Sequence, residues 1–223
     1  MNTQTIAIDQ KGLPKAILFD VDGTTYSSLR MRICIALHMC IHILMHLKDI
    51  KIVKIISAFR KEREKRAGEY FGETESLEYL QYQWAAEVLH IPAGEVRRVI
   101  TMWMYTVPLR YMRYSAYADV FAVLDILKQK GVKVAMVSDY PVTEKLKALG
   151  ITVDVEVSAL DADINALKPC TRSYEKAIQV LGMTNSDCWI VGDRSDRDGA
   201  VAQSLGIPYF SSIRKLKPRL TQK

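Results

Sequence analysis

The sequence of 223 residues has little that is typical of a secreted or disulfide-linked protein. Its first twelve residues lack the apolar segment of a secretory signal, so we expect none there. Low-complexity tracts and internal repeats are also missing, and both polar ends, residues 1–12 and 215–223, are expected to be loose. The few cysteines show neither metal-type spacing nor the density of a small disulfide scaffold, which favours free thiols in a reducing cytoplasm. These cysteines are Cys34, Cys40, Cys170 and Cys188.

The charge pattern gives little reason to expect nucleic acid as a partner. The net charge of +6 favours anionic partners only weakly, and basic residues do not form a stripe with interleaved aromatic residues. Residues 60–66, RKEREKR, alternate basic and acidic side chains, which is typical of a solvated helix face. We therefore expect a small anionic ligand rather than a polyanion.

Apolar runs alternate with helical patterns over most of the chain, which predicts an α/β fold with a parallel sheet wrapped by helices. The expected helices span residues 118–130 and 173–181. From about residue 27 to 113 the sequence instead predicts helices without a strand, placed directly after the first strand and its turn. The expected strands span residues 16–20, 132–139, 153–158, 188–193 and 207–210.

The stretch KAILFDVDGTTYSS (15–28) ends an apolar strand in two carboxylates. Asp20 and Asp22 are two residues apart, so in an extended segment both side chains point the same way. A turn is the simplest interpretation, because Asp and Gly are common after strands. However, the carboxyl end of a strand is also where open α/β sheets bind ligands. Two carboxylates there repel each other unless a cation or a proton lies between them.

Three further strand ends carry polar residues, each of which has a simpler interpretation. Ser138 can donate to a phosphate oxygen or be an ordinary loop serine. Lys168, which precedes a proline, can reach inward or lie exposed. Asp193 and the aspartates that follow it, Asp196 and Asp198, can cap a helix or bind a hard cation such as Mg²⁺.

Taken in order, DVDGT, Ser138, the KP pair at Lys168 and GDRSDRD resemble the four motifs of haloacid dehalogenase (HAD) superfamily hydrolases. The resemblance spans residues 15–210. It is strongest to the subclass with a helical cap after the first motif, which includes phosphoglycolate phosphatases and β-phosphoglucomutases. It implies a Rossmann-like core domain formed by residues 1–26 and 114–223, with a helical cap domain at 27–113.

The resemblance also implies a role for each motif residue. Asp20 would be the nucleophile that accepts a phosphoryl group, and Asp22 the general acid and then the general base. Ser138 and Lys168 would bind the phosphate oxygens. Mg²⁺ would be the cofactor, with Asp20, the backbone carbonyl of Asp22, Asp193 and Asp198 around it. Haloacid dehalogenases lack an acid at the position of Asp22, so its presence favours phosphate chemistry.

The expected function is a Mg²⁺-dependent phosphatase in the cytoplasm, acting on a small phosphorylated metabolite through an aspartyl-phosphate. A phosphotransferase or mutase acting on a sugar phosphate is the first alternative. A binding protein without turnover and a membrane-associated partner handling a phosphorylated lipid precursor are others. Contact with a membrane surface is the less favoured interpretation, and the sequence is compatible with a monomer or a homodimer.

The beginning of the insert is apolar nearly all round, and it is predicted to be one helix over residues 29–59. Packing inside the cap is the favoured interpretation; a dimer contact or a lipid contact is the alternative. Cys34, His38, His42 and His46 form a stripe along this helix. A helix rise of about 1.5 Å per residue keeps three histidines from converging on one ion, so we favour packed or solvent-facing histidines over a metal site.

Two further parts of the insert could meet a substrate. Arg30 and Arg32, just after the first motif, could contact a second anionic group or simply lie on the surface. Residues 103–114, WMYTVPLRYMRY, could face the leaving group, but ordinary cap core is slightly favoured.

Overall fold

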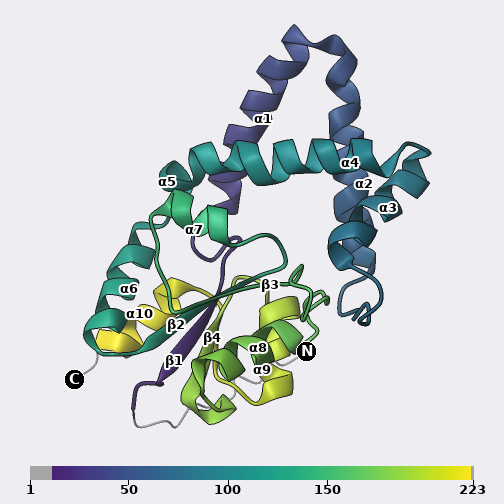
Figure 1. Ribbon diagram of the computed structural model, residues 1–223. Helices are drawn as coiled ribbons and strands as arrows, with labels where there is room; N and C mark the ends of the chain where they lie inside the picture. The colour runs from purple at the N-terminus through teal and green to yellow at the C-terminus, as the bar shows by residue number, and fades with distance from the viewer. Residues whose placement is uncertain (1–11, 222–223) are drawn as a thin grey trace, which may run out of the picture.

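The computed structural model describes residues 12–221 (Figure 1). Five parallel strands form one sheet in the order β3-β2-β1-β4-β5, which confirms the predicted α/β fold class. Residues 1–11, where no secretory signal is expected, lie outside the described residues. The strands are β1 (Ala16–Asp20), β2 (Lys133–Ser138), β3 (Val155–Ser158), β4 (Cys188–Val191) and β5 (Tyr209–Phe210).

Helices cover both faces of the sheet (Figure 1). Ile17 and Phe19 of β1 lie in a buried cluster with side chains of α6 and α10, whereas Ala16 and Leu18 lie in a second cluster with α8 and α9. The alternation follows from the two-residue period of a strand, and burial of both faces explains why β1 is apolar throughout. The helices of this part are α6 (Ala118–Gln129), α7 (Thr143–Leu149), α8 (Arg172–Leu181), α9 (Ala200–Leu205) and α10 (Ile213–Thr221).

The middle of the sheet determines where the site can lie. β1 pairs with β2 on one side and with β4 on the other, so Phe19 lies opposite both Met136 and Val191. The strand order reverses direction between β1 and β4. In such sheets the connections leave in opposite directions at this point, and ligands bind outside the carboxyl ends of the strands.

The insert between β1 and α6 consists of helices and turns, as predicted, within the described part of the chain. Tyr26 and Ala116 form an isolated antiparallel bridge where the chain leaves the sheet and returns to it. The domain boundaries after residue 26 and at residue 114 stay predictions. The elements are α1 (Ser28–Met45), the 3-10 turn η1 (Leu47–Ile50), α2 (Lys51–Lys65), α3 (Leu77–Leu89), α4 (Ala93–Ile100), the π-turn η2 (Thr101–Thr106), the 3-10 turn η3 (Val107–Tyr111) and α5 (Met112–Ser115).

The prediction of one helix over residues 29–59 is wrong. The helix ends at His46, whose φ of −135° and ψ of 72° are not helical, and α2 starts after the turn η1. The favoured interpretation that this segment packs inside the cap holds for one side of α1 only: Ile35 and Met39 pack against the core of the insert, whereas Met31 is the only buried residue of the helix. Figure 1 shows α1 rising away from the sheet and α2 returning beside it.

The basic end of the chain is more ordered than its composition predicts. Residues 213–221 form α10, in which Leu216 and Leu220 are completely buried. Lys217 anchors the helix to α6 through an ion pair of 2.7 Å with Asp119. Tertiary packing therefore outweighs the unfavourable proline at position 218.

Candidate active site

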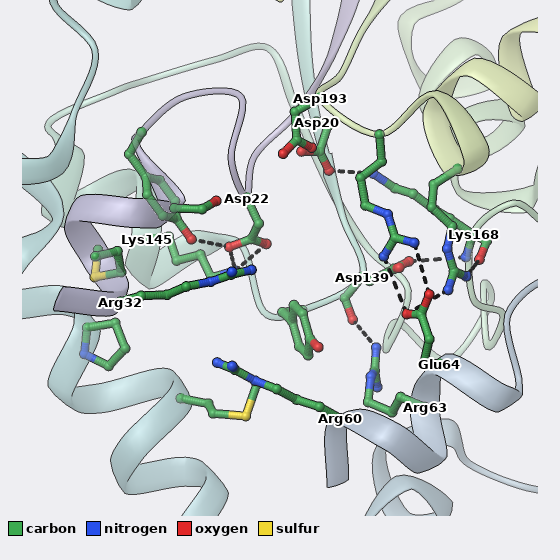
Figure 2. Close-up of a pocket in the computed structure, with 18 of the residues that line it drawn as sticks. Asp20, Asp22, Arg32, Arg60, Arg63, Glu64, Asp139, Lys145, Lys168 and Asp193 are labelled. Carbon is green, nitrogen blue, oxygen red and sulfur yellow. Dashed lines mark hydrogen bonds and ion pairs between the residues drawn. The ribbon is translucent and has the colours of Figure 1, made fainter. Parts of the chain in front are cut away.

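The structure brings five of the six predicted site residues to one edge of the sheet, around one cavity of about 380 Å³ (Figure 2). Asp20 ends β1, and Ser138, the sixth, ends the neighbouring β2. Lys168 follows the loop after β3, and Asp193 follows β4. This convergence arises because parallel strands end at the same edge of a sheet.

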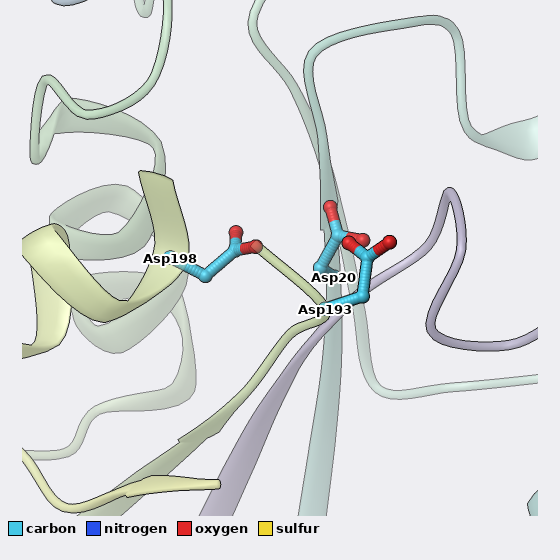
Figure 3. Close-up of side chains that lie close together, drawn as sticks. All are labelled: Asp20, Asp193 and Asp198. Atoms are coloured by element: carbon cyan, nitrogen blue, oxygen red, sulfur yellow. The ribbon is translucent and has the colours of Figure 1, made fainter. Parts of the chain in front are cut away.

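Three carboxylates that line this cavity lie close together (Figure 3). Asp20, Asp193 and Asp198 each offer an oxygen, and these atoms all lie within 4.8 Å of one another. Asp20 and Asp198 are buried, and Asp193 lies at the exposed mouth. Desolvation, together with the charge of Asp198, raises the pKa of Asp193. Such mutual repulsion calls for a compensating cation.

Two glycines make room for this cluster. A Cβ atom at Gly23, whose φ is +98°, would lie 2.1 Å from Oδ2 of Asp193. A Cβ atom at Gly192 would lie 2.4 Å from the Cγ of Asp198. Any larger residue would therefore push a carboxylate out of the cluster, so the glycine of the D-x-D-G motif has a steric reason in this chain.

Lys168 supplies one compensating charge. Its Nζ lies 2.6 Å from Oδ1 of Asp20 and 2.7 Å from Oδ1 of Asp198, and the Tyr174 hydroxyl donates to the same Asp198 oxygen at 2.8 Å. Burial disfavours the charged lysine, but the carboxylate of Asp20 and the neighbouring acidic groups raise the pKa of Lys168 well above its usual value. Burial raises the pKa of Asp20 although Lys168 opposes the shift.

The donor set fits a hard divalent cation. Mg²⁺ binds a small number of carboxylate oxygens and retains several waters, and the cluster offers three carboxylates in a cavity open on one side. Asp20, Asp193 and Asp198 would hold the ion. The predicted contribution of the Asp22 backbone carbonyl stays a prediction.

Asp22 lies apart from the cluster and is bound by three groups. Its carboxylate accepts hydrogen bonds from Ser138 Oγ at 2.6 Å, from Lys145 Nζ at 2.6 Å to each oxygen, and from the Tyr26 hydroxyl. Burial alone would raise the pKa of Asp22, but Lys145 and the two hydroxyls lower it. Asp22 is therefore ionised in this arrangement, a state that suits a base.

Lys145 was not among the residues predicted from the sequence. It lies on α7, seven residues after the end of β2, and its side chain is only 7% exposed. A lysine within TEKLK carries no local signal of burial, since the same letters describe an exposed helix. Its position in the first turns after a functional strand end is the one feature that could have drawn attention to it.

Comparison with known proteins identifies the family. A family model described as haloacid dehalogenase-like hydrolase matches residues 14–206. The chain belongs to this family. It is therefore an enzyme of the hydrolase class, and the match confirms the resemblance derived from the four motifs. No curated protein matches the chain in sequence.

Solved structures agree with this fold. A HAD phosphatase from Thermococcus onnurineus is 20% identical, with a TM-score of 0.61 and coverage of 92% of this chain and 97% of that one. A 2-haloacid dehalogenase from Pseudomonas syringae pv. Tomato DC3000 is 16% identical, with a TM-score of 0.63 and coverage of 93% and 98%. CbbY from Rhodobacter sphaeroides, solved with phosphate, is 16% identical, with a TM-score of 0.53 and coverage of 90% and 88%. At these identities the likeness shows the shared fold alone.

The wall that α1 and α2 contribute to the hydrolase's cavity is cationic. Figure 2 shows Arg32 extending from α1 toward Asp22, and Arg60 and Arg63 extending from α2. Arg32 and Arg60 form no ion pair within the described part of the chain, which leaves both charges free to meet an anion. Arg30, the other arginine considered after the first motif, does not line this cavity.

The prediction that residues 60–66 form a solvated helix face is wrong in part. Glu62 and Arg63 are buried. Arg63 donates to the backbone oxygen of Asp139 at 2.7 Å and to Gln81, and its guanidinium lies over the Tyr140 ring. The helical period places Arg60, Arg63 and Glu64 on one side of α2, and this side faces the site.

One glutamate of α2 links the insert to the sheet of the hydrolase. Glu64 accepts from Arg194 at 2.9 Å and forms an ion pair of 2.8 Å with Arg197. The hydrogen bond from Arg194 is the largest cause that lowers the pKa of Glu64 to about 2. Arg197 also donates to the backbone oxygen of Lys168. An ion-pair network thus lies directly between α2 and the loop that carries Asp193 and Asp198.

The remaining residues of the insert have structural roles or border the cavity. His38 accepts or donates a hydrogen bond of 2.8 Å with the Tyr111 hydroxyl and packs edge-on against Trp103; His42 lies 2.8 Å from Asp49. His38 and His42 are half-buried and His46 is exposed, so the stripe contains both packed and solvent-facing histidines. Trp103 belongs to the core of the insert and also lines the cavity.

Proposed function

We propose that this hydrolase is a Mg²⁺-dependent phosphatase that cleaves a small phosphomonoester through a phosphorylated Asp20. The proposal also assigns it to the subclass with a helical cap after the first motif. The observation that carries it is Asp22, a carboxylate that faces the cavity two residues after the nucleophile and is held by Ser138, Lys145 and Tyr26.

Asp22 separates phosphatase from dehalogenase chemistry on physical grounds. An alkoxide is a poor leaving group and departs readily only when an acid gives it a proton, whereas a halide leaves without one. Solved structures of similar fold include dehalogenases as well as a phosphatase, so the fold does not decide between the two. A carboxylate in this position with three partners has a use in phosphate transfer and none in displacement of a halide.

In the first step, a carboxylate oxygen of Asp20 attacks phosphorus as the bond to the leaving oxygen breaks. Asp22 gives its proton to the leaving oxygen, so an alcohol departs and an acyl phosphate remains on Asp20. Lys145 opposes protonation of Asp22 in the structure. A bound phosphate dianion would attract the Lys145 ammonium away from Asp22, which would allow Asp22 to hold the proton needed in this step.

In the second step, Asp22 takes a proton from water, and the resulting hydroxide oxygen attacks the phosphorus. The bond between phosphorus and Asp20 breaks, which restores the carboxylate and releases inorganic phosphate. Asp22 is left protonated; it returns this proton to solvent when phosphate leaves and Lys145 contacts it again, and takes one up from solvent as the next substrate binds. The covalent route replaces one difficult displacement by two easier ones.

A carboxylate that attacks a phosphate dianion meets charge repulsion, and the site contains the groups to offset it. When bound by Asp20, Asp193 and Asp198, Mg²⁺ would neutralise charge that develops on the phosphoryl oxygens. Lys168, buried against Asp20, would do the same from the other side. Ser138 donates its hydrogen bond to Asp22 in the structure, and a phosphoryl oxygen of the substrate would compete with Asp22 for that hydrogen bond.

The cavity favours a leaving group that is itself small and anionic. Its volume of about 380 Å³ lies near the lower end of the range for ligand sites, roughly 300–1,000 Å³. Arg32 and Arg60 on the wall opposite Asp20 have no partner among the described residues. Transfer of the phosphoryl group to a sugar hydroxyl, as in a mutase, remains the first alternative, since Asp22 would activate either acceptor.

The test compares four substrates on one protein. We expect Mg²⁺-dependent release of phosphate from p-nitrophenyl phosphate and from 2-phosphoglycolate, and no chloride release from 2-chloropropionate. EDTA and Asp20→Asn should each abolish turnover. Chloride release without phosphate release would instead assign dehalogenase activity, and a requirement for glucose 1,6-bisphosphate would assign a mutase. Ethyl phosphate, which lacks the carboxylate of 2-phosphoglycolate, tests the cationic wall: Arg60→Met should raise KM for 2-phosphoglycolate alone.

A further inference from the structure

From Ile33 to its end at Met45, helix α1 has no Asp, Glu, Lys or Arg, yet almost none of the helix is buried. Met31 is its one buried residue, and only 6% of the window Ser28–Met45 lies inside the structure. Within the described residues it is the single helix long and apolar enough to cross a bilayer; core helices and signal sequences can meet the same test. Since α1 is not a core helix here, its apolar side chains need another explanation.

The exposed side chains gather toward the far end of the helical hairpin. Leu37, Ile41 and Leu44 follow one another at helical spacing, so they lie on one side of α1. The patch continues through η1 into α2, and Figure 1 shows this turn at the point of the molecule most distant from the sheet. We call the patch the apolar tip; its exposed members are Leu37, Ile41, Leu44, Met45, Leu47, Ile50 and Val53.

The most exposed residues lie at the turn itself. The side chains of Leu44 and Leu47 are 77% and 74% exposed. Such values mean that the protein gains almost nothing from these leucines in its own core. Burial of one such leucine side chain against a partner would tighten that association by roughly tenfold or more.

Positive charge surrounds the apolar tip. Residues 44–54, which form the turn and its flanks, contain three lysines and one acidic side chain, Asp49; the Asp49 carboxylate lies 2.8 Å from Nε2 of His42, and Lys51 pairs with Glu95. A cavity of about 640 Å³ lies between the hairpin and α4, and Arg98 and Arg110 line it. These two arginines are exposed and form no ion pair with any described residue. The lone acidic residue of the cavity wall is again Asp49.

We propose that the apolar tip inserts into the headgroup region of a membrane that contains anionic lipids, with Arg98 and Arg110 binding lipid phosphate groups. A projecting end with apolar side chains and a basic surround matches the way amphipathic segments lie in a membrane interface. A second copy of the chain would bring two basic surrounds together, which charge repulsion disfavours. The proposal does not depend on the reaction at Asp20.

Vesicle flotation of the full chain tests the proposal. The probes are vesicles of phosphatidylcholine alone and of phosphatidylcholine with phosphatidylglycerol. We expect binding to the anionic vesicles, a loss of at least about tenfold in affinity for L44Q/L47Q, and a weaker salt dependence for R98Q/R110Q. As controls, V88Q/V180Q removes two exposed apolar side chains elsewhere, and K128Q/K130Q removes the same charge at the C-terminal end of α6. Both should bind like the unmodified chain.

Hydrolysis of p-nitrophenyl phosphate in solution separates this proposal from loss of the fold, because L44Q/L47Q changes residues outside the catalytic cavity. Where hydrolysis is absent in every protein, circular dichroism provides the same control. Failure of the unmodified chain to bind anionic vesicles would overturn the proposal, as would binding that L44Q/L47Q leaves unchanged. If the unmodified chain does not bind vesicles but sediments as a dimer, and L44Q/L47Q sediments as a monomer, the apolar tip would instead be a contact with a second copy of the chain.

Discussion

Lys145 Nζ lies 2.6 Å from both carboxylate oxygens of Asp22, and both groups lie at the cavity that holds Asp20. This pair determines the protonation of the residue that the proposed reaction uses twice. Burial would raise the pKa of Asp22, and Lys145 is the largest of the causes that lower it. The ammonium therefore favours the base form, and its displacement favours the acid form.

Replacement of Lys145 by methionine should change the pH dependence of turnover. Without the ammonium, burial dominates and the pKa of Asp22 rises, so the protonated form persists to higher pH. Lys145 contacts Asp22 in the free enzyme, which the kcat/KM profile reports, so if turnover requires protonated Asp22 the alkaline limb of the kcat/KM profile moves upward by roughly one pH unit or more. Lys147→Met, on the exposed side of the same helix, should leave the profile unchanged. An alkaline limb that stays in place in Lys145→Met would exclude control of Asp22 by this lysine.

Asp22→Asn should slow turnover most for substrates with poor leaving groups. For an alkyl phosphate we expect kcat to fall by about 10²–10⁴-fold, because the alkoxide no longer receives a proton. For p-nitrophenyl phosphate the loss should be much smaller, since p-nitrophenolate leaves unaided. Steady-state kinetics with the two substrates measure this difference. Equal losses for both would contradict a role for Asp22 as general acid.

The carboxylate cluster should bind Mg²⁺ without substrate. We expect Mg²⁺ to raise Tm of the unmodified chain, as any ligand of the folded state does, and Asp193→Asn to weaken binding by about tenfold or more. Asp196→Asn is the matched control, because Asp196 lies in the same loop but outside the cluster. Calorimetric titration measures the affinity. Equal affinity in both variants would place the ion elsewhere.

Glu64→Gln should loosen the contact between α2 and the loop of Asp193. The pKa of Glu64 is about 2, below its usual value of 4.5, so the ion pairs are present at neutral pH and are lost only as pH falls toward 2. The carboxylate is more than half exposed, so we expect the free energy of unfolding to fall by no more than about 1 kcal/mol. KM should nevertheless rise several-fold, since the cavity wall is attached through Glu64. Glu73→Gln serves as the control; an unchanged KM in Glu64→Gln would show that these ion pairs do not hold the wall.

The strand ends and their polar residues could be predicted from local sequence. Apolar runs give β1, β2 and β4, and parallel strands necessarily bring their carboxyl ends together. That is why Asp20, Asp22, Lys168, Asp193 and Asp198 lie around one cavity, with Ser138 bonded to Asp22. Their roles in catalysis stay predictions.

The residues contributed by the insert could not be predicted in the same way. The alternating charges of residues 60–66 are equally typical of a solvated helix. Arg63 instead contacts Asp139, and Glu64 pairs with Arg194; both contacts are long-range, so local sequence does not indicate them. Lys145 was missed for the same reason. The exposure of α1 could not be predicted either. An apolar composition indicates that a helix is covered, but not whether the covering surface belongs to the same chain or to a partner.

The central claim is that Asp20 accepts a phosphoryl group. Mass spectrometry of protein quenched in acid during turnover of p-nitrophenyl phosphate with Mg²⁺ tests it most directly. We predict a peptide containing Asp20 that is heavier by one phosphoryl group and that is absent in Asp20→Asn. Turnover of substrate with no phosphorylated form of this peptide, or with Asp20→Asn as active as the unmodified chain, would contradict the account.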